Sequence, residues 1–439
     1  MTAARTFAIR TARQLLSKLP LPMATPVDLP RAAPSPSPKC LAFKRLALVG
    51  RGAPDAAVLS DFLQDCGGRV EMGSSTDPAD CVVAVLGERP SYDDLAGLHG
   101  SLSARVSALS KCGRVLIVSR CSSPVVTGGV HGFVRSLARE LGRKGVTVNA
   151  VMSDDLSAAC PLAAFLLSER ASYISAQSLV MAPGAAPAST DAAPMLAVVT
   201  GASRGIGAAI TRILAASGYR VAMLDVAQQA EQGQAVCDSL GGEPAGMSFV
   251  ACDVRDDAAV ERTLERVRSL SPLGTIDVLV NNAGITRDRT FAKMSPDAWG
   301  DVLGVDLGAV MHVTRRALTR MAPGGRIINV ASVTGLSGNF GQTNYAAAKG
   351  GVVGFTLQAG RELESRGLCV TAVAPGLIET AMTDAMPAVQ REIAKQLISL
   401  AQAGIPEDVA MAVEFLARRE SWPLRGQALR VDGGMFFGP

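Results

Sequence analysis

The sequence lacks the features that mark several classes of protein. Its nine cysteines are scattered, with no Cys-x-x-Cys pair and no histidines at ligand spacing, which argues against a disulfide framework or a zinc site. No run of about 18 uncharged apolar residues occurs, so we expect no membrane span. The formal net charge of +4 comes without a block of lysine and arginine, so nucleic-acid binding is not expected. We therefore expect a cytoplasmic protein with reduced, mostly buried thiols and no metal.

The length and composition indicate two packed domains. A chain of 439 residues is longer than one ordinary α/β domain needs, and 48% hydrophobic with 19% charged residues is typical of a well-packed protein. Residues 182–194 are rich in proline, glycine and alanine without apolar periodicity, which predicts an interdomain linker. The predicted domains are thus 41–181 and 195–439.

The first forty residues form a predicted N-terminal arm. They are basic and proline-rich, with a single acid, Asp28, against Arg5, Arg10, Arg13, Lys18 and Arg31. Such a segment is either a mitochondrial transit peptide, since these are rich in arginine and poor in acids, or an arm that packs on the protein surface.

The same order of elements recurs in the two predicted domains, which favours duplication of one architecture. The matching segments are 46–50 with 197–201, 69–72 with 220–223, 113–118 with 325–330, 132–148 with 354–370, and 165–177 with 415–427. Each is an apolar strand-like run or an amphipathic helix, so both halves should be parallel α/β sheets. A chance similarity of α/β rhythm is the alternative.

The first domain lacks the chemistry of the second at the aligned positions. Pro54 and Ala56 stand opposite Gly205 and Gly207, Ser74 opposite Asp225, and Ser123 and Thr127 opposite Tyr345 and Lys349. A pyrophosphate cannot approach such a turn closely, and serine and threonine cannot replace a phenol and an ammonium. We expect the first domain to be non-catalytic.

A glycine-rich turn between a strand and a helix predicts a dinucleotide site in the second domain. The strand 195–200 leads into Gly201-Ala-Ser-Arg-Gly-Ile-Gly207, and a helix-period segment follows. Glycines admit the pyrophosphate, and the free N–H groups and dipole of the helix bind it. The candidate contacts in the turn are Gly201, Ser203, Arg204, Gly205, Ile206 and Gly207.

Acidic residues at the ends of the next two strands indicate which nucleotide binds. Asp225 can bond the ribose diol and would repel a 2′-phosphate, which favours NAD(H). Arg204 could pair with that phosphate, so NADP(H) is not excluded. Asp253, beside Val254, is either a contact to the adenine amino group or a turn former at a strand end.

A tyrosine and a lysine four residues apart predict an acid catalyst. Tyr345 and Lys349 share one face of a predicted helix, and a fixed ammonium lowers the pKa of a neighbouring phenol. Without further motifs, a tyrosine and a lysine at this spacing usually only share one face of a helix and have no catalytic role. Here Ser332 lies thirteen residues before Tyr345, just past a strand, and Asn-Asn-Ala-Gly at 281–284 ends another strand.

Together these motifs resemble the classical short-chain dehydrogenase/reductase family over residues 196–434. The resemblance implies a Rossmann-type doubly wound sheet and hydride transfer to a ketone. Tyr345 would donate the proton, Ser332 would hold the carbonyl oxygen, and Lys349 would bind the nicotinamide ribose and tune Tyr345. Further cofactor contacts implied by the family are Asn282, Ala283, Gly284, Pro375, Gly376, Ile378 and Thr380. Residues 381–397 resemble the family's mobile lid.

One position departs from the family pattern. The family's fourth catalytic residue is an asparagine, and Asp306 stands there. An aspartate lacks the amide donor but keeps an acceptor and the backbone carbonyl that family members use to hold a relay water near the lysine. Its negative charge would oppose a lowered pKa of Tyr345, so we expect activity that is retained but weaker or more sensitive to pH.

The segments 285–288, 341–345 and 374–380 resemble 3-oxoacyl-[acyl-carrier-protein] reductases, and the layout resembles their high-molecular-weight form. That form implies a smaller flavodoxin-like, or degenerate Rossmann-like, first domain, an NADH preference and a bacterial cytoplasm. The substrate would be a thioester on acyl carrier protein or CoA in fatty acid metabolism. Its acidic groups would meet Arg287, Arg289 or Lys293, unless these are ordinary surface charges.

Two other functions stay open. The chain could reduce another ketone or alcohol, or it could be a nucleotide-binding scaffold with little catalysis. We also expect a homodimer or homotetramer, assembled through surface helices and the apolar tail Met435-Phe436-Phe437.

Overall fold

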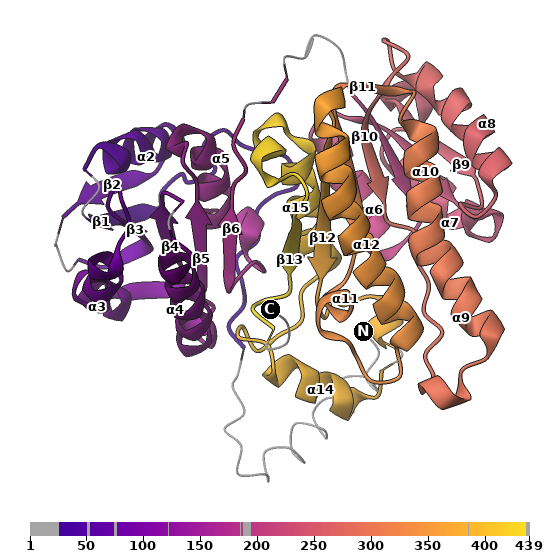
Figure 1. Cartoon of the computed structure of the whole chain (residues 1–439). Coiled ribbons are helices and arrows are strands. Elements are labelled where there is room, and N and C mark those ends of the chain that lie inside the picture. The colour runs from indigo at the N-terminus through magenta and orange to yellow at the C-terminus, as the bar shows by residue number, and fades with distance from the viewer. Residues whose placement is uncertain are drawn as a thin grey trace.

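A computed structural model of the 439-residue chain describes residues 26–435 apart from 51–52, 74–76, 122, 185, 188–194 and 385. Within these residues it holds two parallel β-sheets, each covered by helices on both faces (Figure 1). No described helix is long and apolar enough to cross a membrane. The predicted α/β fold class is confirmed.

The first sheet has six described strands in the order β2-β1-β3-β4-β5-β6, an extension of the flavodoxin-like order. Its strands are β1 (Arg45–Gly50), β2 (Arg69–Met72), β3 (Ala79–Val85), β4 (Leu109–Ser119), β5 (Thr147–Met152) and β6 (Gln177–Val180). Its helices are α2 (Ala53–Asp65), α3 (Tyr92–Ser107), α4 (Pro124–Gly142), α5 (Leu156–Leu167) and the short η1 (Glu169–Ala171).

The second sheet has seven described strands in the order β13-β12-β11-β10-β7-β8-β9, which is the Rossmann order with one strand added. Its strands are β7 (Leu196–Thr200), β8 (Arg220–Asp225), β9 (Met247–Ala251), β10 (Ile276–Asn281), β11 (Met321–Val330), β12 (Cys369–Pro375) and β13 (Ala428–Val431). Strands such as β10 and β12 are buried along nearly their whole length, as expected where helices cover both faces of a parallel sheet.

The helices of the second sheet include one long segment with a π-helical turn in its middle. They are α6 (Gly205–Ala216), α7 (Ala230–Ser239), α8 (Asp257–Val267), α9 (Pro296–Leu303), the π-helical η6 (Gly304–Gly308), α10 (Ala309–Ala317), α11 (Val333–Ser337), α12 (Thr343–Glu362), α13 (Ala381–Asp384), α14 (Ala388–Gln396) and α15 (Pro406–Ala417). Short 3-10 turns are η2 (Ala227–Gln229), η3 (Glu243–Ala245), η4 (Arg268–Leu270), η5 (Phe291–Lys293), η7 (Glu364–Arg366) and η8 (Arg419–Leu424).

The two sheets meet through matching elements, with α5 and β6 of the first domain beside α15 and β13 of the second (Figure 1). The rings of Phe165 and Phe415 stack with centroids 4.4 Å apart. Gln177 Nε2 donates to the Arg430 carbonyl at 2.8 Å, and Gln427 Nε2 donates to the Val180 carbonyl at 2.7 Å. An offset of 250 residues relates Phe165 to Phe415, Gln177 to Gln427 and Val180 to Arg430, so the two hydrogen bonds are equivalent and the contact is nearly two-fold symmetric.

The N-terminal arm and the predicted linker are described only in part. Residues 1–25 and 188–194 lie outside the described residues, and so does Ser74. The described part of the arm packs on the protein: Leu29 is buried, and Arg31 forms a bidentate ion pair with Asp408 at 2.9 and 3.0 Å. At the other end of the chain, Met435 forms an antiparallel bridge with Ile398, while Phe436 and Phe437 lie outside the described residues.

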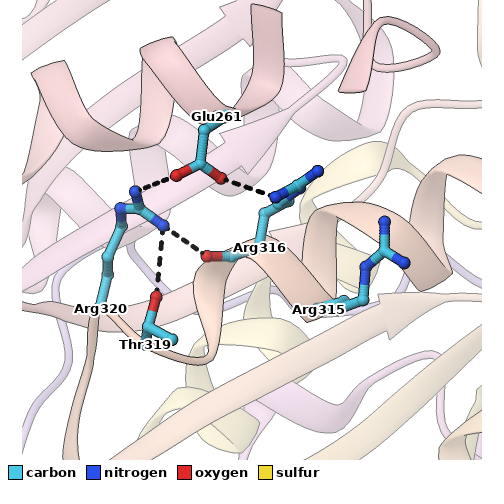
Figure 2. A pocket seen from close by; sticks show the side chains of 5 residues that line it. All are labelled: Glu261, Arg315, Arg316, Thr319 and Arg320. Carbon is cyan, nitrogen blue, oxygen red and sulfur yellow. Dashed lines mark hydrogen bonds and ion pairs between the residues drawn. The ribbon is translucent and has the colours of Figure 1, made fainter. Parts of the chain in front are cut away.

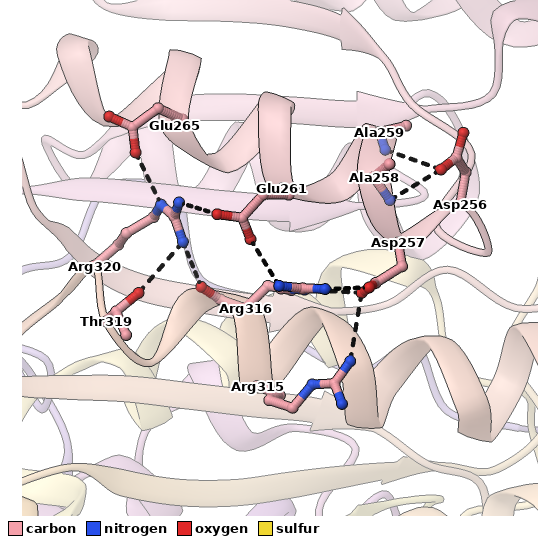
Figure 3. A network of polar contacts seen from close by, with 10 residues as sticks. All are labelled: Asp256, Asp257, Ala258, Ala259, Glu261, Glu265, Arg315, Arg316, Thr319 and Arg320. Carbon is pink, nitrogen blue, oxygen red and sulfur yellow. Dashed lines mark hydrogen bonds and ion pairs between the residues drawn. The ribbon is translucent and has the colours of Figure 1, made fainter.

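Helices α8 and α10 are joined by a ladder of ion pairs on the surface (Figure 3). Asp257, Glu261 and Glu265 lie four residues apart along α8 and pair with Arg315, Arg316 and Arg320. Solvent screens exposed pairs of this kind, so each one alone contributes little to stability. The ladder joins α8 to the C-terminal end of α10 and to Arg320, which follows it.

Candidate active site

The site residues predicted from the sequence gather at the carboxyl edge of the second sheet. The glycine turn follows β7, Asp225 ends β8, Asn282 follows β10, Ser332 follows β11 and Gly376 follows β12. The chain changes direction between the neighbouring strands β7 and β10, and ligands of doubly wound sheets bind at such a switch point.

A surface cavity of about 490 Å³ lies elsewhere, at the ion-pair ladder (Figure 2). It is lined by Glu261, Arg315, Arg316, Thr319 and Arg320. Its arginines pair with carboxylates of α8, and none of the predicted site residues lines it. We interpret this cavity as part of the ladder.

The glycine turn has the shape that a pyrophosphate requires. Gly201 has φ of 64°, and a Cβ on Gly207 would lie 2.0 Å from the Gly201 carbonyl oxygen. Helix α6 begins at Gly205 and has no side-chain cap, so the N–H groups of its first turn are available to an anion.

Three more residues of this turn were candidates. Ser203 is buried, and its hydroxyl has no hydrogen-bond partner among the described residues. Arg204 is exposed, and Ile206 packs against the core. The turn therefore fits a dinucleotide, with one unused donor at Ser203.

Asp225 is held close to the glycine turn. Its two carboxylate oxygens accept hydrogen bonds from the Ser203 N–H at 3.0 Å and the Val226 N–H at 2.9 Å. The side chain is half-buried. Because its carboxylate is bonded to the turn at Ser203, it lies at the end of the turn where a ribose would lie.

Asp253 has a different environment. Arg255 donates to its carboxylate from the backbone N–H at 2.9 Å and from the guanidinium at 2.8 Å, and the side-chain hydrogen bond from Arg255 lowers the pKa of Asp253. This geometry favours the turn-forming interpretation. Its neighbour Val254 is buried in an apolar pocket that Thr200 and Ala283 also line.

The Asn-Asn-Ala-Gly segment connects two strand ends. Asn282 Nδ2 donates to the carbonyls of Thr200 and Gly201, both at 2.9 Å, and the Ala283 N–H donates to Thr200 Oγ1 at 3.1 Å. Asn282 and Ala283 therefore hold the end of β10 against the glycine turn, and Gly284 follows at the Lys349 side of the site.

The four predicted catalytic residues lie together. The Ser332 side chain lies close enough to the Tyr345 phenol to lower its pKa, and Lys349 Nζ lies 5.7 Å from the centroid of the Tyr345 ring. Lys349 Nζ also donates to the Val330 carbonyl at 2.9 Å and lies 3.4 Å from Asp306 Oδ2. The ammonium is thus fixed between the end of β11, the phenol and the carboxylate.

Asp306 is fully buried in the π-helical turn. Its Oδ1 accepts the Ile285 N–H at 2.8 Å, while Oδ2, which faces Lys349, has no hydrogen-bond partner within the described protein. The extra residue in a π turn shifts a side chain relative to a regular helix, and here it directs Asp306 at the lysine.

The pKa values follow from burial and from these charges. Burial raises the pKa of Tyr345, whereas the charge of Lys349 lowers it and the charge of Asp306 raises it. The net effect is a pKa above the usual value of a phenol. The predicted lowering is therefore wrong for the polypeptide by itself, because burial outweighs the ammonium. Burial raises the pKa of Asp306 against the effect of Lys349. Burial lowers the pKa of Lys349, but Asp306 and Tyr345 raise it by more.

The segment after β12 completes the edge. Pro375 ends β12, the Gly376 N–H donates to the Val431 carbonyl at 3.0 Å, and Ile378 is buried. Thr380 lies beside the glycine turn, because a Cβ on Gly205 would be 3.8 Å from its methyl group. Helices α13 and α14 follow, within the range predicted to resemble a lid.

Two positioning residues were not predicted from the sequence. The Asn344 side chain donates to the carbonyls of Arg287 and Ala298 and accepts the Tyr345 N–H at 2.8 Å. Asn281 donates to Thr314 and to Asn329, and Asn329 donates to Thr356. These bonds join α10, β10, β11 and α12, and their partners are too far apart in sequence for a motif to identify them.

The first domain has an ion pair at the equivalent edge. Arg120, which follows β4, makes a bidentate contact with Asp55 in the first turn of α2 at 2.7 and 2.9 Å. A carboxylate at a helix N-terminus occupies the position that favours a phosphate, so this edge is unsuited to a dinucleotide.

Comparison with known proteins identifies the family. The family model of short chain dehydrogenases matches residues 195–390. The chain is 42% identical over 243 residues to the 3-oxoacyl-[acyl-carrier-protein] reductase FabG of Escherichia coli strain K12, in an alignment that covers 55% of this chain and 97% of that enzyme. It is 43% identical over 243 residues to FabG of Vibrio harveyi, and that alignment also covers 55% of this chain and 97% of the enzyme. It is 42% identical over 242 residues to FabG of Staphylococcus aureus strain Mu50, with the same two coverages. The chain therefore belongs to the short chain dehydrogenase family.

Proposed function

We propose that the chain is an NADH-dependent reductase of 3-oxoacyl thioesters carried by acyl carrier protein or CoA, acting in fatty acid synthesis. The observation that carries the proposal is the group of Ser332, Tyr345 and Lys349 beside a turn that fits a dinucleotide. The relatives support the substrate class, since their names describe reduction of 3-oxoacyl groups on acyl carrier protein.

The mechanism assigns each side chain one task. When bound, the reduced nicotinamide supplies a hydride to the carbonyl carbon. Ser332 holds the carbonyl oxygen, and Tyr345 gives it a proton, so the ketone becomes a hydroxyl group. Lys349 holds positive charge next to the phenolate that remains, which stabilises it. Ile378 and Thr380 bound the nicotinamide end of the site.

Basic residues at the edge of the site would meet the carrier. Arg287, Arg289 and Lys293 are exposed in the loop between β10 and α9, and the Arg289 N–H donates to the Gly341 carbonyl at 2.9 Å, just before α12. The loop therefore lies close to Tyr345. Exposed cations at that place suit the phosphates of CoA or the acidic surface of an acyl carrier.

The first prediction concerns Tyr345. With NADH and acetoacetyl-CoA or longer 3-oxoacyl thioesters, the wild type should oxidise NADH, and Tyr345→Phe should lower kcat by about 100-fold or more while NADH still binds, because one proton donor is removed. Tyr92→Phe, which alters an exposed phenol of the first domain, should have no effect. Undiminished turnover in Tyr345→Phe would refute the role of the phenol; turnover of simple ketones but no thioester would favour another substrate.

A second prediction concerns nucleotide choice. Asp225→Asn keeps an acceptor for Ser203 but removes the charge that repels a 2′-phosphate, so the ratio of kcat/KM for NADPH to that for NADH should rise about tenfold. Steady-state kinetics with both nucleotides measures this ratio. Asp253→Asn is the matched control, and it should leave the ratio unchanged. A wild type that already prefers NADPH would contradict the proposed cofactor.

A third prediction concerns pH. Tyr345 donates only when protonated, so reduction slows as the pH rises through its pKa. Since the charge of Asp306 raises the pKa of Tyr345, Asp306→Asn should move the alkaline fall in kcat to lower pH. Asp288→Asn removes an exposed acid that acts in the same direction, and its effect should be smaller because solvent screens it. An alkaline limb that does not move would mean that Asp306 carries no charge in the working enzyme.

A further inference from the structure

The 379–403 segment, which contains α13 and α14, is closed at its base. Ile378 and Gly404 form a parallel bridge. The Glu379 N–H donates to the Gly404 carbonyl at 2.8 Å, and the Gly404 N–H donates to the Leu377 carbonyl at 3.0 Å. The segment therefore leaves the sheet and returns to it at one place, next to two of the residues that bound the nicotinamide end of the site.

A tyrosine of the first domain lies on this base. Tyr173, between η1 and β6, is fully buried. Its phenol donates to the Gln402 carbonyl at 2.9 Å and lies 3.4 Å from the Leu377 carbonyl oxygen. One hydroxyl group thus contacts Leu377, just before the 379–403 segment, and Gln402, near its end, although it is remote from both in sequence.

The ring of Tyr173 also fixes the return of the segment. A Cβ on Gly404 would lie 2.5 Å from the ring atoms Cδ1 and Cε1 of Tyr173, so the glycine backbone packs directly against the ring. The Tyr173 carbonyl accepts the Gly433 N–H at 2.9 Å, and the Gly433 carbonyl accepts the Leu400 N–H at 3.2 Å. The ring and its backbone therefore lie between the returning segment and the end of β13.

Other parts of the first domain and the arm contact the same returning stretch. Gly142, at the end of α4, packs against the Ser399 backbone, since a Cβ there would lie 2.3 Å from the Ser399 carbonyl oxygen. Gln402 Nε2 donates to the Val27 carbonyl of the arm at 2.9 Å. Further along, Arg31 pairs with Asp408 in the first turn of α15.

We infer that the first domain positions the active site through Tyr173, which fixes the base of the 379–403 segment and thereby the placement of Ile378 and Thr380. The inference rests on the proposed function, which assigns the nicotinamide end of the site to these two residues. Tyr173 touches neither substrate nor cofactor, so it is a positioning residue. Burial raises the pKa of its phenol, which keeps the hydroxyl protonated as a donor over the working pH range.

The test is Tyr173→Phe, which keeps the ring and removes the hydroxyl. Tyr219→Phe is the matched control, because Tyr219 is also buried and its phenol also donates to a backbone carbonyl, that of Ala417 at 3.4 Å, away from the segment. Amide hydrogen exchange of the full chain should be about fivefold faster over residues 377–404 in Tyr173→Phe, the factor expected from one lost buried hydrogen bond. In Tyr219→Phe that stretch should exchange as in the wild type.

Kinetics and cofactor binding give the second readout. The KM for NADH, and the Kd from quenching of protein fluorescence, should rise about threefold to tenfold in Tyr173→Phe with a smaller change in kcat, because the reacting groups are intact. Tyr219→Phe should leave both constants unchanged even if it lowers Tm as much. Gly404→Ala, whose added methyl group would press on the ring of Tyr173, should reproduce the exchange and binding changes of Tyr173→Phe.

The outcomes separate this inference from the proposed function. If both tyrosine variants alter exchange over 377–404 equally, or if neither does, Tyr173 has only a general structural role and the inference is wrong. A failure of the proposed function would instead appear as wild-type protein that binds NADH and reduces no thioester, and the exchange and binding comparisons would still decide the role of Tyr173.

Discussion

The active site depends on one buried cation. Lys349 lies inside the protein, and a buried ammonium is stable only where acceptors and opposite charge surround it. The Val330 carbonyl, the Asp306 carboxylate and the face of Tyr345 supply that environment. Each belongs to a different element, so the packing of β11, η6 and α12 is constrained by the same contacts that bring the phenol to the carboxyl edge of the sheet.

Fold and function are separable within this one chain. Both domains are parallel α/β sheets, and they contact each other through matching helices and edge strands. At the edge where the second domain has a glycine turn and a phenol, the first has the ion pair of Arg120 with Asp55. Chemistry therefore resides in a few side chains rather than in the architecture, and the first domain acts on the reaction, in our account, only through its contacts with the second.

Local motifs predicted much of this structure. Three signals depend only on neighbours in sequence: the glycine turn, the pair of Tyr345 and Lys349, and the periodicity of the strands. From these signals we predicted the fold class and the catalytic candidates, which the structure places at one edge of the sheet. Burial is a property of the whole fold, so the sequence did not show that, in the polypeptide by itself, burial raises the pKa of Tyr345 by more than Lys349 lowers it. The bonds of Asn344, the network of Asn281 and the contact of Tyr173 with the second domain join residues distant in sequence, and no motif identifies their partners.

We propose that this edge of the sheet transfers a hydride from NADH to carbon 3 of an acyl thioester. The most direct measurement uses NADH deuterated at carbon 4 of the nicotinamide, on the transferred face, with acetoacetyl-CoA, followed by mass spectrometry of the product. The account predicts 3-hydroxybutyryl-CoA with a single deuterium on carbon 3, formed by the wild type and not by Tyr345→Phe. A product without deuterium, or no product while NADH binds, would contradict it.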